Sequence, residues 1–452
     1  MVMSVFRLEL RRTVALWVPV AMLVVAAAFI VVGGTITFGS VAWNREWLNA
    51  VQWSRYLLIF LWPIIVGAAV LQGTRDARSG VEELFGSTPR PAGHRAVTLG
   101  LAVGLMAVAG YLVIIAAGAG QVVAAGGLFT TSWLVPIVLG VLSVVAGATL
   151  GLGLGRLLPY PVTAPASAVL AFVTVLLLQL ANANPDSSPI PNSVALLGIA
   201  PAALTSPFAP PASSVQIGQL FWLCGLALTG FLLLLAGSVR SRLLALLPVA
   251  AGLAIALPVF PAAHAGNVTV DKAASALVCD GPVCVTRLHE NWLSTVSGPA
   301  KEALQKLEKL PQHPSRFEES IVPYSNTEAG PRDPARLLVR RDEWSLRGKS
   351  GRALTAALLS GAGTPRCAGA SYGGDKNDRE DAARWVMSQW LLGSDTPPTP
   401  VSDPPLKALA DPAWATLKAL PEAEQTARVA AARQLELTCS GDPLKALTEG
   451  RH

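Results

Sequence analysis

Residues 97–119 read VTLGLAVGLMAVAGYLVIIAAGA, a run without a single charged side chain. A helix of about twenty apolar residues is long enough to cross the roughly 30 Å of hydrocarbon in a bilayer. The run therefore predicts a transmembrane helix. A chain built around such helices belongs to a different fold class from a water-soluble domain.

The same pattern recurs through the first 263 residues. Seven stretches qualify as predicted spans: 14–34, 56–73, 97–119, 134–154, 163–181, 219–237 and 243–263. None of them has a Lys, Arg, Asp, Glu or His in its interior. Ion-coupled transporters and pumps keep ionisable residues within the bilayer. The pattern therefore argues against a proton-driven transporter and excludes a voltage sensor.

Charge divides the chain at the same place. Only 14% of the 452 residues are charged, whereas soluble domains carry about 25%. Residues 1–263 hold 12 Arg, no Lys and six acidic residues, and residues 264–452 hold 23 basic and 23 acidic ones. The pI of 9.2 thus comes from arginines beside predicted spans. They are better explained as topology signals than as a nucleic-acid surface.

The arginines also orient the chain. With a cytoplasmic N-terminus, the inside segments carry ten arginines and the outside loops before residue 264 carry only Arg45 and Arg55. The inside set is Arg7, Arg11, Arg12, Arg75, Arg78, Arg90, Arg95, Arg156, Arg240 and Arg242. Positive residues favour the cytoplasmic side. The expected protein is a multi-pass plasma-membrane protein with residues 264–452 outside the cell.

The seventh span, 241–263, has a second interpretation. Basic Ser238–Arg242, an apolar run and then Ala263-His264-Ala265 resemble a signal peptide with its cleavage site. An internal site of this kind favours an uncleaved span. Both interpretations export the segment that follows.

The cysteines point to an oxidising compartment. Cys224 lies in the sixth predicted span, and the other four follow the last span: Cys279, Cys284, Cys367 and Cys439. Four exported cysteines favour two disulfides, for which three connectivities exist. We favour Cys279–Cys284 and Cys367–Cys439. Zinc is the weaker alternative, because there is no C-x-x-C motif and no histidine at ligand spacing near Cys367 or Cys439.

The exported domain is predicted to be mixed and mainly helical. Helical periodicity appears at 297–310, 350–360, 377–393 and 421–438, and short strands are expected at 268–270, 283–285 and 337–340. Pro-rich breaks at 311–314 and 397–405 separate these pieces.

No catalytic or metal motif is complete in this domain. His289-Glu290 begins like a zinc-peptidase helix, but Leu293 stands where H-E-x-x-H needs its second histidine. The Lys349-Ser350 pair ends like a nucleotide-binding loop, but Glu343 replaces the required glycine. We therefore expect neither an enzyme nor a metal site in this chain.

Two connecting segments are longer and more structured than simple linkers. Residues 73–95 read GTRDARSGVEELFGSTPRPAGHR, in which Ser79 can cap a short helix that ends at Gly86 and Pro89. This loop is either a solvated topogenic loop or a docking surface for a cytoplasmic partner. The external segment 182–218 is moderately apolar but broken by prolines, so a pair of short helices dipping into the outer leaflet is expected.

These features together resemble the membrane subunits of the second class of ABC exporters (ABC-2 type), which work with a separate ATPase. Ser4–Thr13 (SVFRLELRRT) resembles the family's amphipathic interface helix. Arg75–Pro89 (RDARSGVEELFGSTP) looks like its coupling-helix region, and 182–218 like its re-entrant hairpin. Similar permeases are common in actinobacteria, in line with the Ala/Arg/Gly/Pro-rich composition. The seventh span and the external domain depart from the simplest family pattern.

The resemblance implies an architecture and a division of labour. The α-helical chain would comprise an interface helix (1–13), a six-span permease core (14–240), a seventh span (241–263) and an extracellular domain (264–452). Its coupling loop would be 74–95 and its re-entrant hairpin 182–218. Coupling residues would be Arg75, Asp76, Arg78, Glu82, Glu83, Leu84 and Phe85, and interface residues Phe6, Arg7, Glu9, Arg11 and Arg12.

By the same resemblance, two permease subunits, identical or different, would pair with two ATPase subunits that carry ATP and magnesium. The assembled exporter would move an amphiphile such as a lipid, peptide, glycan or drug out of the cell. One alternative is a sensor or assembly scaffold whose external domain binds an envelope protein or ligand. Another is a membrane-anchored hydrolase, which would require His289 or His313 beside carboxylates in a pocket.

Overall fold

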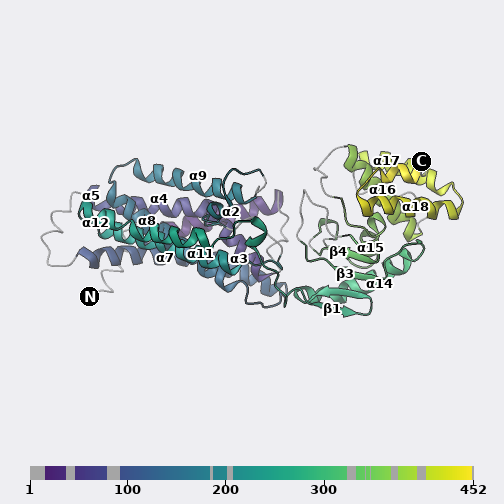
Figure 1. Cartoon of the computed structure of the whole chain (residues 1–452), viewed down its shortest axis with the longest axis horizontal. Coiled ribbons are helices and arrows are strands. Elements are labelled where there is room, and N and C mark those ends of the chain that lie inside the picture. Colours follow the sequence, from purple (N-terminus) through teal and green to yellow (C-terminus); the bar gives the residue numbers. More distant parts are fainter. Residues whose placement is uncertain are drawn as a thin grey trace. The chain divides into compact units, whose positions relative to one another are not determined.

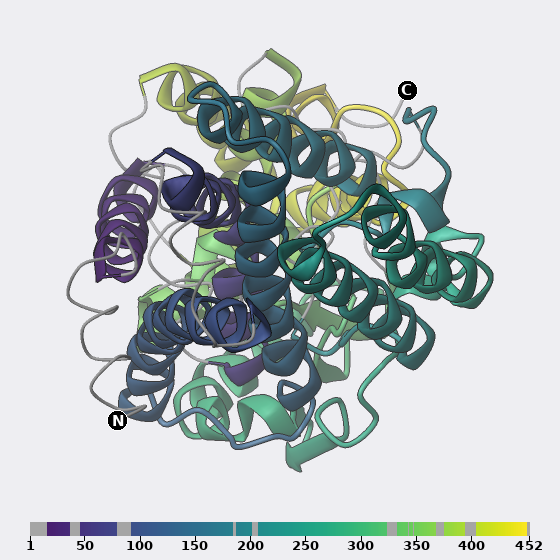
Figure 2. The same cartoon turned by 90° about the vertical axis from the view of Figure 1, so that its left-hand side faces the viewer.

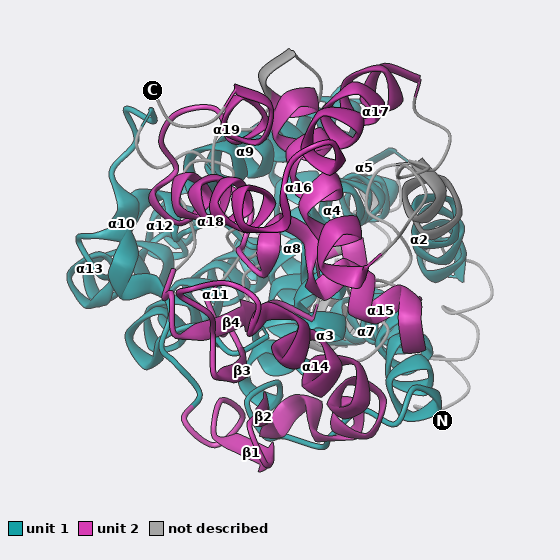
Figure 3. Cartoon of the chain, turned by 90° about the vertical axis from the view of Figure 1, so that its right-hand side faces the viewer, with its two compact units in different colours: residues 1–271 teal, residues 272–452 magenta. Residues whose placement is uncertain are grey.

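The computed structural model describes residues 16–36, 46–78, 92–183, 187–200, 207–322, 332–341, 343–346, 348–367, 375–393 and 404–449. The chain divides into two compact units, residues 1–271 and 272–452, coloured separately in Figure 3. The sequence placed the boundary after residue 263. It lies later because residues 267–271 form main-chain hydrogen bonds with residues 208–212.

The N-terminal unit is a bundle of helices (Figure 1). Its long helices are α2 (Trp17–Ile36), α3 (Trp47–Tyr56), α4 (Leu58–Gly73), α7 (Ala92–Ala124), α8 (Leu134–Leu157), α9 (Thr163–Ala183), α11 (Ser213–Leu235) and α13 (Leu247–Val259). Short helices are α5 (Arg75–Arg78), α10 (Asn192–Ala195), α12 (Val239–Leu244) and the 3-10 turn η2 (His264–Asn267). Figure 2 views this bundle from its end.

Five helical stretches among the described residues are long and apolar enough to cross a membrane. They are Val97–Ala124, Leu134–Leu157, Thr163–Ala183, Ser213–Leu235 and Val239–Val259. A sixth candidate is the pair α3 and α4, which bend by 47° at Leu57. The described apolar part of α2, Trp17–Phe29, is shorter. The chain is thus a helical protein with several membrane-spanning candidates, each at a stretch that the sequence predicts.

Close backbone approach holds the centre of this bundle together. Helix α8 packs against α4, α7 and α11. A methyl group at Gly151 would lie 2.5 Å from the carbonyl oxygen of Val66 in α4, and one at Gly153 would lie 2.5 Å from that of Gly230 in α11. Small residues let membrane helices approach closely enough for dense van der Waals packing. The glycines of α8 therefore set its distance from two neighbours.

The C-terminal unit combines a small sheet with helices. Its strands are β1 (Leu277–Asp280), β2 (Val283–Thr286), β3 (Arg316–Glu319) and β4 (Arg336–Val339). Its α-helices are α14 (Leu293–Leu307), α15 (Gly351–Leu358), α16 (Asp375–Leu392), α17 (Pro404–Lys418), α18 (Glu422–Thr438) and α19 (Pro443–Glu449). The 3-10 helices are η3 (Arg287–Trp292), η4 (Trp344–Leu346) and η5 (Ser360–Ala362).

The sheet has the order β1-β2-β3-β4. Strands β1 and β2 form an antiparallel hairpin, while β2, β3 and β4 are parallel. One core joins Phe317 and Leu337 of the sheet to Leu307, Met387 and Trp414 of the helices. The unit therefore buries a core of its own, as expected for a chain segment of this length.

Several predicted elements differ from those observed. The strand expected at 268–270 is only an isolated bridge between Val268 and Pro211. Strand β3 was missed because its sequence, RFEE, contains a single apolar residue. Helix α17 begins inside the expected Pro-rich break at 397–405, because proline is tolerated in the first turn of a helix.

Candidate functional site

A broken segment joins α9 to α11 and is described at residues 187–200 and 207–212. The sequence predicted a pair of short helices here; the described residues form one single-turn helix, α10. The main-chain hydrogen bonds within residues 191–198 use the carbonyl groups of Pro191, Asn192, Val194 and Ala195, so the carbonyl groups that follow need other donors. At membrane depth, irregular backbone is tolerated only where protein shields it.

Side chains of the bundle supply these donors to five consecutive carbonyl groups, Ala195 to Ile199. The Gln219 amide donates to Leu196 and Gly198, at 3.2 Å each. The Trp222 indole donates to Leu197 at 2.9 Å. Asn182 donates to Ala195 at 2.9 Å and Arg55 donates to Ile199 at 3.3 Å. The broken segment is therefore fixed by side chains from three helices.

Arg55 is the charged member of this network. It is 1% exposed, although the sequence analysis placed it in an external loop. Its Nη2 donates to Gln219 Oε1 at 2.9 Å, and its Nε has no hydrogen-bond partner. Within the described residues no carboxylate lies at ion-pair distance from Arg55. A buried ionisable residue in a membrane protein marks a candidate functional site.

The residue pattern held a weak signal for this site. Gln219 and Trp222 are separated by three positions and so share one face of α11. Neither residue carries a predicted function in the sequence. Arg55 was missed because the sequence does not show that α3 folds into the bundle.

A second connection ties α3 to α7 and α8. The hydroxyls of Ser54 and Tyr111 lie 3.3 Å apart, and both residues are fully buried. A methyl group at Gly140 would overlap the Tyr111 ring, so the ring occupies a notch in α8. The helix that carries Arg55 is therefore held by side-chain contacts to α7, α11 and the broken segment.

The predicted coupling and interface residues are mostly outside the described residues. These are Phe6, Arg7, Glu9, Arg11, Arg12, Glu82, Glu83, Leu84 and Phe85. Arg75 and Arg78 are exposed on α5, and Asp76 is described only as part of that helix. A single residue, Thr74, separates α5 from α4, and it is bonded to both through the Val70 carbonyl (2.9 Å) and the Arg78 amide (3.0 Å).

The cysteines of the C-terminal unit form two disulfides. Cys279 bonds to Cys284 across the β1–β2 hairpin, where the two residues are direct partners in the register. Cys367 bonds to Cys439, at the end of α18. This is the pairing that the sequence analysis favoured among the three.

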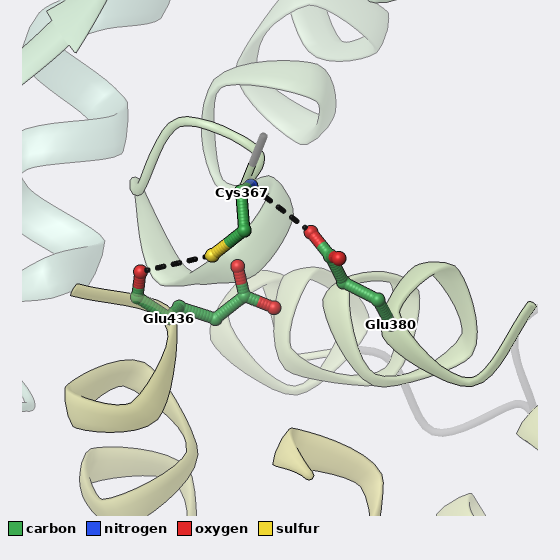
Figure 4. A group of neighbouring side chains, drawn as sticks. All are labelled: Cys367, Glu380 and Glu436. Atoms are coloured by element: carbon green, nitrogen blue, oxygen red, sulfur yellow. Dashed lines mark hydrogen bonds between the residues drawn. The ribbon is translucent and has the colours of Figure 1, made fainter. Parts of the chain in front are cut away.

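Figure 4 shows Cys367 beside Glu380 and Glu436, a geometry that resembles a metal site. The Cys367 sulfur is already bonded to Cys439, and metals bind the free thiolate. Glu436 pairs with the buried Arg384 at 2.7 Å. Burial raises the pKa of the Glu436 carboxyl, and the Arg384 charge opposes that rise. The arrangement is therefore better described as a buried Arg384–Glu436 ion pair beside a disulfide.

One arrangement bears on the hydrolase alternative. His289 Nδ1 contacts Glu319 Oε1, and the other oxygen of Glu319 accepts hydrogen bonds from the amide and hydroxyl of Thr286, both at 2.8 Å. The side chains of His289 and Glu319 are 4% and 1% exposed. A substrate cannot reach them in this conformation. His313 instead lies 3.1 Å from the Leu310 carbonyl.

Comparison with known proteins adds no relative to this description. No family model, curated protein or solved structure matches the chain.

Proposed function

We propose that this chain is the permease subunit of an ATP-driven ABC exporter of the second class. The main support is the broken segment before α11, with side-chain donors on the five carbonyls of Ala195–Ile199. The family that the sequence resembles has re-entrant helices at this place. A shielded, irregular segment between two long apolar helices fits that role.

The proposed topology follows from the arginines. The N-terminus lies in the cytoplasm and seven spans follow, of which α2 and α4 are the first two. An odd number of spans places the C-terminal unit outside the cell. Two disulfides in that unit fit an oxidising compartment. The predicted interface helix (1–13) and the loop 73–95 would then face a cytoplasmic ATPase.

In the proposed mechanism, two ATPase subunits dock at Ser4–Thr13 and Gly73–Arg95 of two permease subunits. Closure of the ATPases pushes on the loop, and the push reaches α4 because only Thr74 separates α5 from it. Helix α4 packs against α8 and α9, so its tilt shifts the helix before the broken segment. The exported substrate is an amphiphile.

The first experiment purifies the chain from native membranes and identifies the ATPase that accompanies it. The complex in vesicles should then show ATP hydrolysis stimulated by an amphiphile, together with movement of that amphiphile. Stimulation by an external ligand without any movement would instead favour the sensor or scaffold. A complex without an ATPase would refute the proposal.

The docking site has a separate test. The double substitution Glu82→Lys/Glu83→Lys should release the ATPase, because both charges of the predicted coupling helix are reversed. Membrane insertion should be unchanged. Arg240→Glu serves as the control. Arg240 is also predicted on the cytoplasmic side of the membrane but lies outside the loop 73–95, so this variant should retain the ATPase. An undisturbed complex in the double variant would exclude this docking surface.

A further inference from the structure

The stalk, residues Pro261–Asp271, leads from the last helix of the N-terminal unit to the start of the C-terminal unit. It runs antiparallel to the end of the broken segment. Three main-chain hydrogen bonds join them: Ala212 N to Asn267 O (2.9 Å), Thr269 N to Pro210 O (3.0 Å) and Asp271 N to Phe208 O (2.8 Å). The stalk is thus bonded to the segment as a strand bonds to its neighbour.

A reciprocal amide pair makes a second connection. Asn192 Nδ2 donates to Asn267 Oδ1 at 2.8 Å, and Asn267 Nδ2 donates back to Asn192 Oδ1 at 2.9 Å. Asn192 also donates to the Pro261 carbonyl at 2.7 Å. Asn267 is 5% exposed, so water does not replace a lost partner easily. The pair fixes the stalk to the beginning of α10.

The broken segment is therefore held from two sides. The donors Arg55, Gln219 and Trp222 fix it to α3 and α11, and the stalk fixes it at residues 192 and 208–212. A contiguous chain of hydrogen-bonded groups is the physical route by which a displacement at one end reaches the other.

Only a short length of chain lies between the last hydrogen bond of the stalk and the first hydrogen bonds of the C-terminal unit. The last stalk bond is made by Asp271 N, and the carbonyls of Ala274 and Ala276 already accept bonds from Leu288 N (3.0 Å) and Arg287 N (2.7 Å) of η3. Only Lys272 and Ala273 lie between. Three residue steps extend to about 10 Å at most. A larger displacement of the C-terminal unit must pull on the stalk.

We propose that the stalk transmits the state of the C-terminal unit to the broken segment. The unit, when it moves or binds a partner, shifts residues 267–271 and through them Asn192 and residues 208–212. This role goes beyond the proposed export function and does not depend on it, because the contacts that carry it lie within this chain alone. The measurement below involves neither ATPase nor transport.

Hydrogen exchange of the full chain in lipid nanodiscs tests the proposal. The probes are the amides of residues 195–198, which are hydrogen-bonded in the structure but do not touch the stalk in the contacts described. Asn267→Ala should speed their exchange about fivefold, the loss expected for one or two hydrogen bonds. Thr269→Ala is the control: its side chain is exposed and its backbone amide is kept. Exchange in α8 reports that the bundle is intact.

A urea titration tests the link to the C-terminal unit itself. Exchange in α16 marks the unfolding of that unit, and exchange at 195–198 should rise at the same urea concentration. A six-residue Gly-Ser insertion between Lys272 and Ala273 lengthens the connection between the stalk and the C-terminal unit. Unfolding of the unit should then no longer raise exchange at residues 195–198. The proposal is wrong if the native chain shows no rise or if the insertion keeps it. Unchanged exchange in Asn267→Ala would also overturn it.

Discussion

Arg433 is a buried cation that serves as a hydrogen-bond hub in the C-terminal unit. Its guanidinium donates to the carbonyls of Ala362 (3.0 Å), Gln312 (2.7 Å) and Pro334 (3.1 Å). Burial lowers the pKa of Arg433 to about 10. Among the described residues no carboxylate pairs with Arg433, and its buried charge is tolerated because η5 and two loops direct carbonyl oxygens at it.

Replacing this hub should destabilise the C-terminal unit strongly. In Arg433→Met the carbonyls of buried Ala362 and of the exposed residues Gln312 and Pro334 lose their charged donor, and we expect the free energy of unfolding to fall by about 3 kcal/mol. The measurement is urea denaturation of the full chain in nanodiscs. Arg352→Met, an exposed position on α15, should change it by less than about 0.5 kcal/mol. Equal losses in both variants would contradict the hub.

Asp280 makes the stability of the same unit dependent on acid pH. Hydrogen bonds from Lys301 and then Ser297, together with the Lys301 charge, lower the pKa of the Asp280 carboxyl. A lowered folded-state pKa adds stability above the unfolded-state pKa of about 4, and that stability is lost as the pH falls through the folded-state value.

We therefore expect Asp280→Asn to be slightly less stable than the native chain at neutral pH and to lose less stability below about pH 4. Lys301→Met removes the largest cause of the shift and should have a similar effect. The measurement is the unfolding free energy of the unit across the acid range. If both variants keep the native acid-side decrease, another carboxyl is responsible.

At the level of helices, contact between α8 and α11 depends on glycine at the crossing. A methyl group at Gly153 would meet the Gly230 carbonyl, and one at Gly230 would meet the backbone of Leu150. The helices would have to separate, losing dispersion contacts along α8. A glycine-to-alanine substitution causes no such loss of packing where no neighbouring atom faces the glycine.

Gly153→Ala should therefore destabilise the N-terminal unit by about 1 to 3 kcal/mol. Gly100→Ala is the matched control, because a methyl group there meets no atom within 4 Å. Alanine is the better helix former, so this variant should be neutral or up to about 1 kcal/mol more stable. Thermal denaturation in nanodiscs distinguishes the two. A stable Gly153→Ala variant would show that the crossing has room.

At the level of the whole chain, the disulfides differ in what they constrain. Cys367 and Cys439 are 72 positions apart, whereas Cys279 and Cys284 are five apart. In the chain-entropy account, a bond that closes the longer loop restricts the unfolded state more. The long-range bond also joins the chain before α16 to the end of α18.

We expect Cys367→Ala/Cys439→Ala to lower the unfolding free energy of the C-terminal unit by about 4 kcal/mol, and Cys279→Ala/Cys284→Ala by about 2 kcal/mol. Urea denaturation of both double variants, beside the native chain, makes the comparison. Equal effects would mean that local packing, and not loop closure, sets the contribution of each bond.

The two units differ in how much of them was predictable. Five of the apolar stretches that the sequence predicts coincide with helices long enough to span a membrane, because each needs about twenty local apolar residues. In the C-terminal unit, α14, α16 and α18 follow their own periodicity, but β3 does not. Glu318 and Glu319 show no strand pattern in the sequence. Their place in the sheet comes from main-chain pairing of β3 with β2 and β4, which are distant in sequence.

The sequence by itself determined the run of apolar helices that includes residues 97–119 and the position of four cysteines after the last of them, because these depend on local composition. Only the tertiary structure decided the candidate site. Arg55 meets Ile199 across 144 positions and Gln219 across 164. Local patterns carry no information about such partners. A lone arginine near a predicted span end reads as a topology signal until the fold surrounds it with the broken segment.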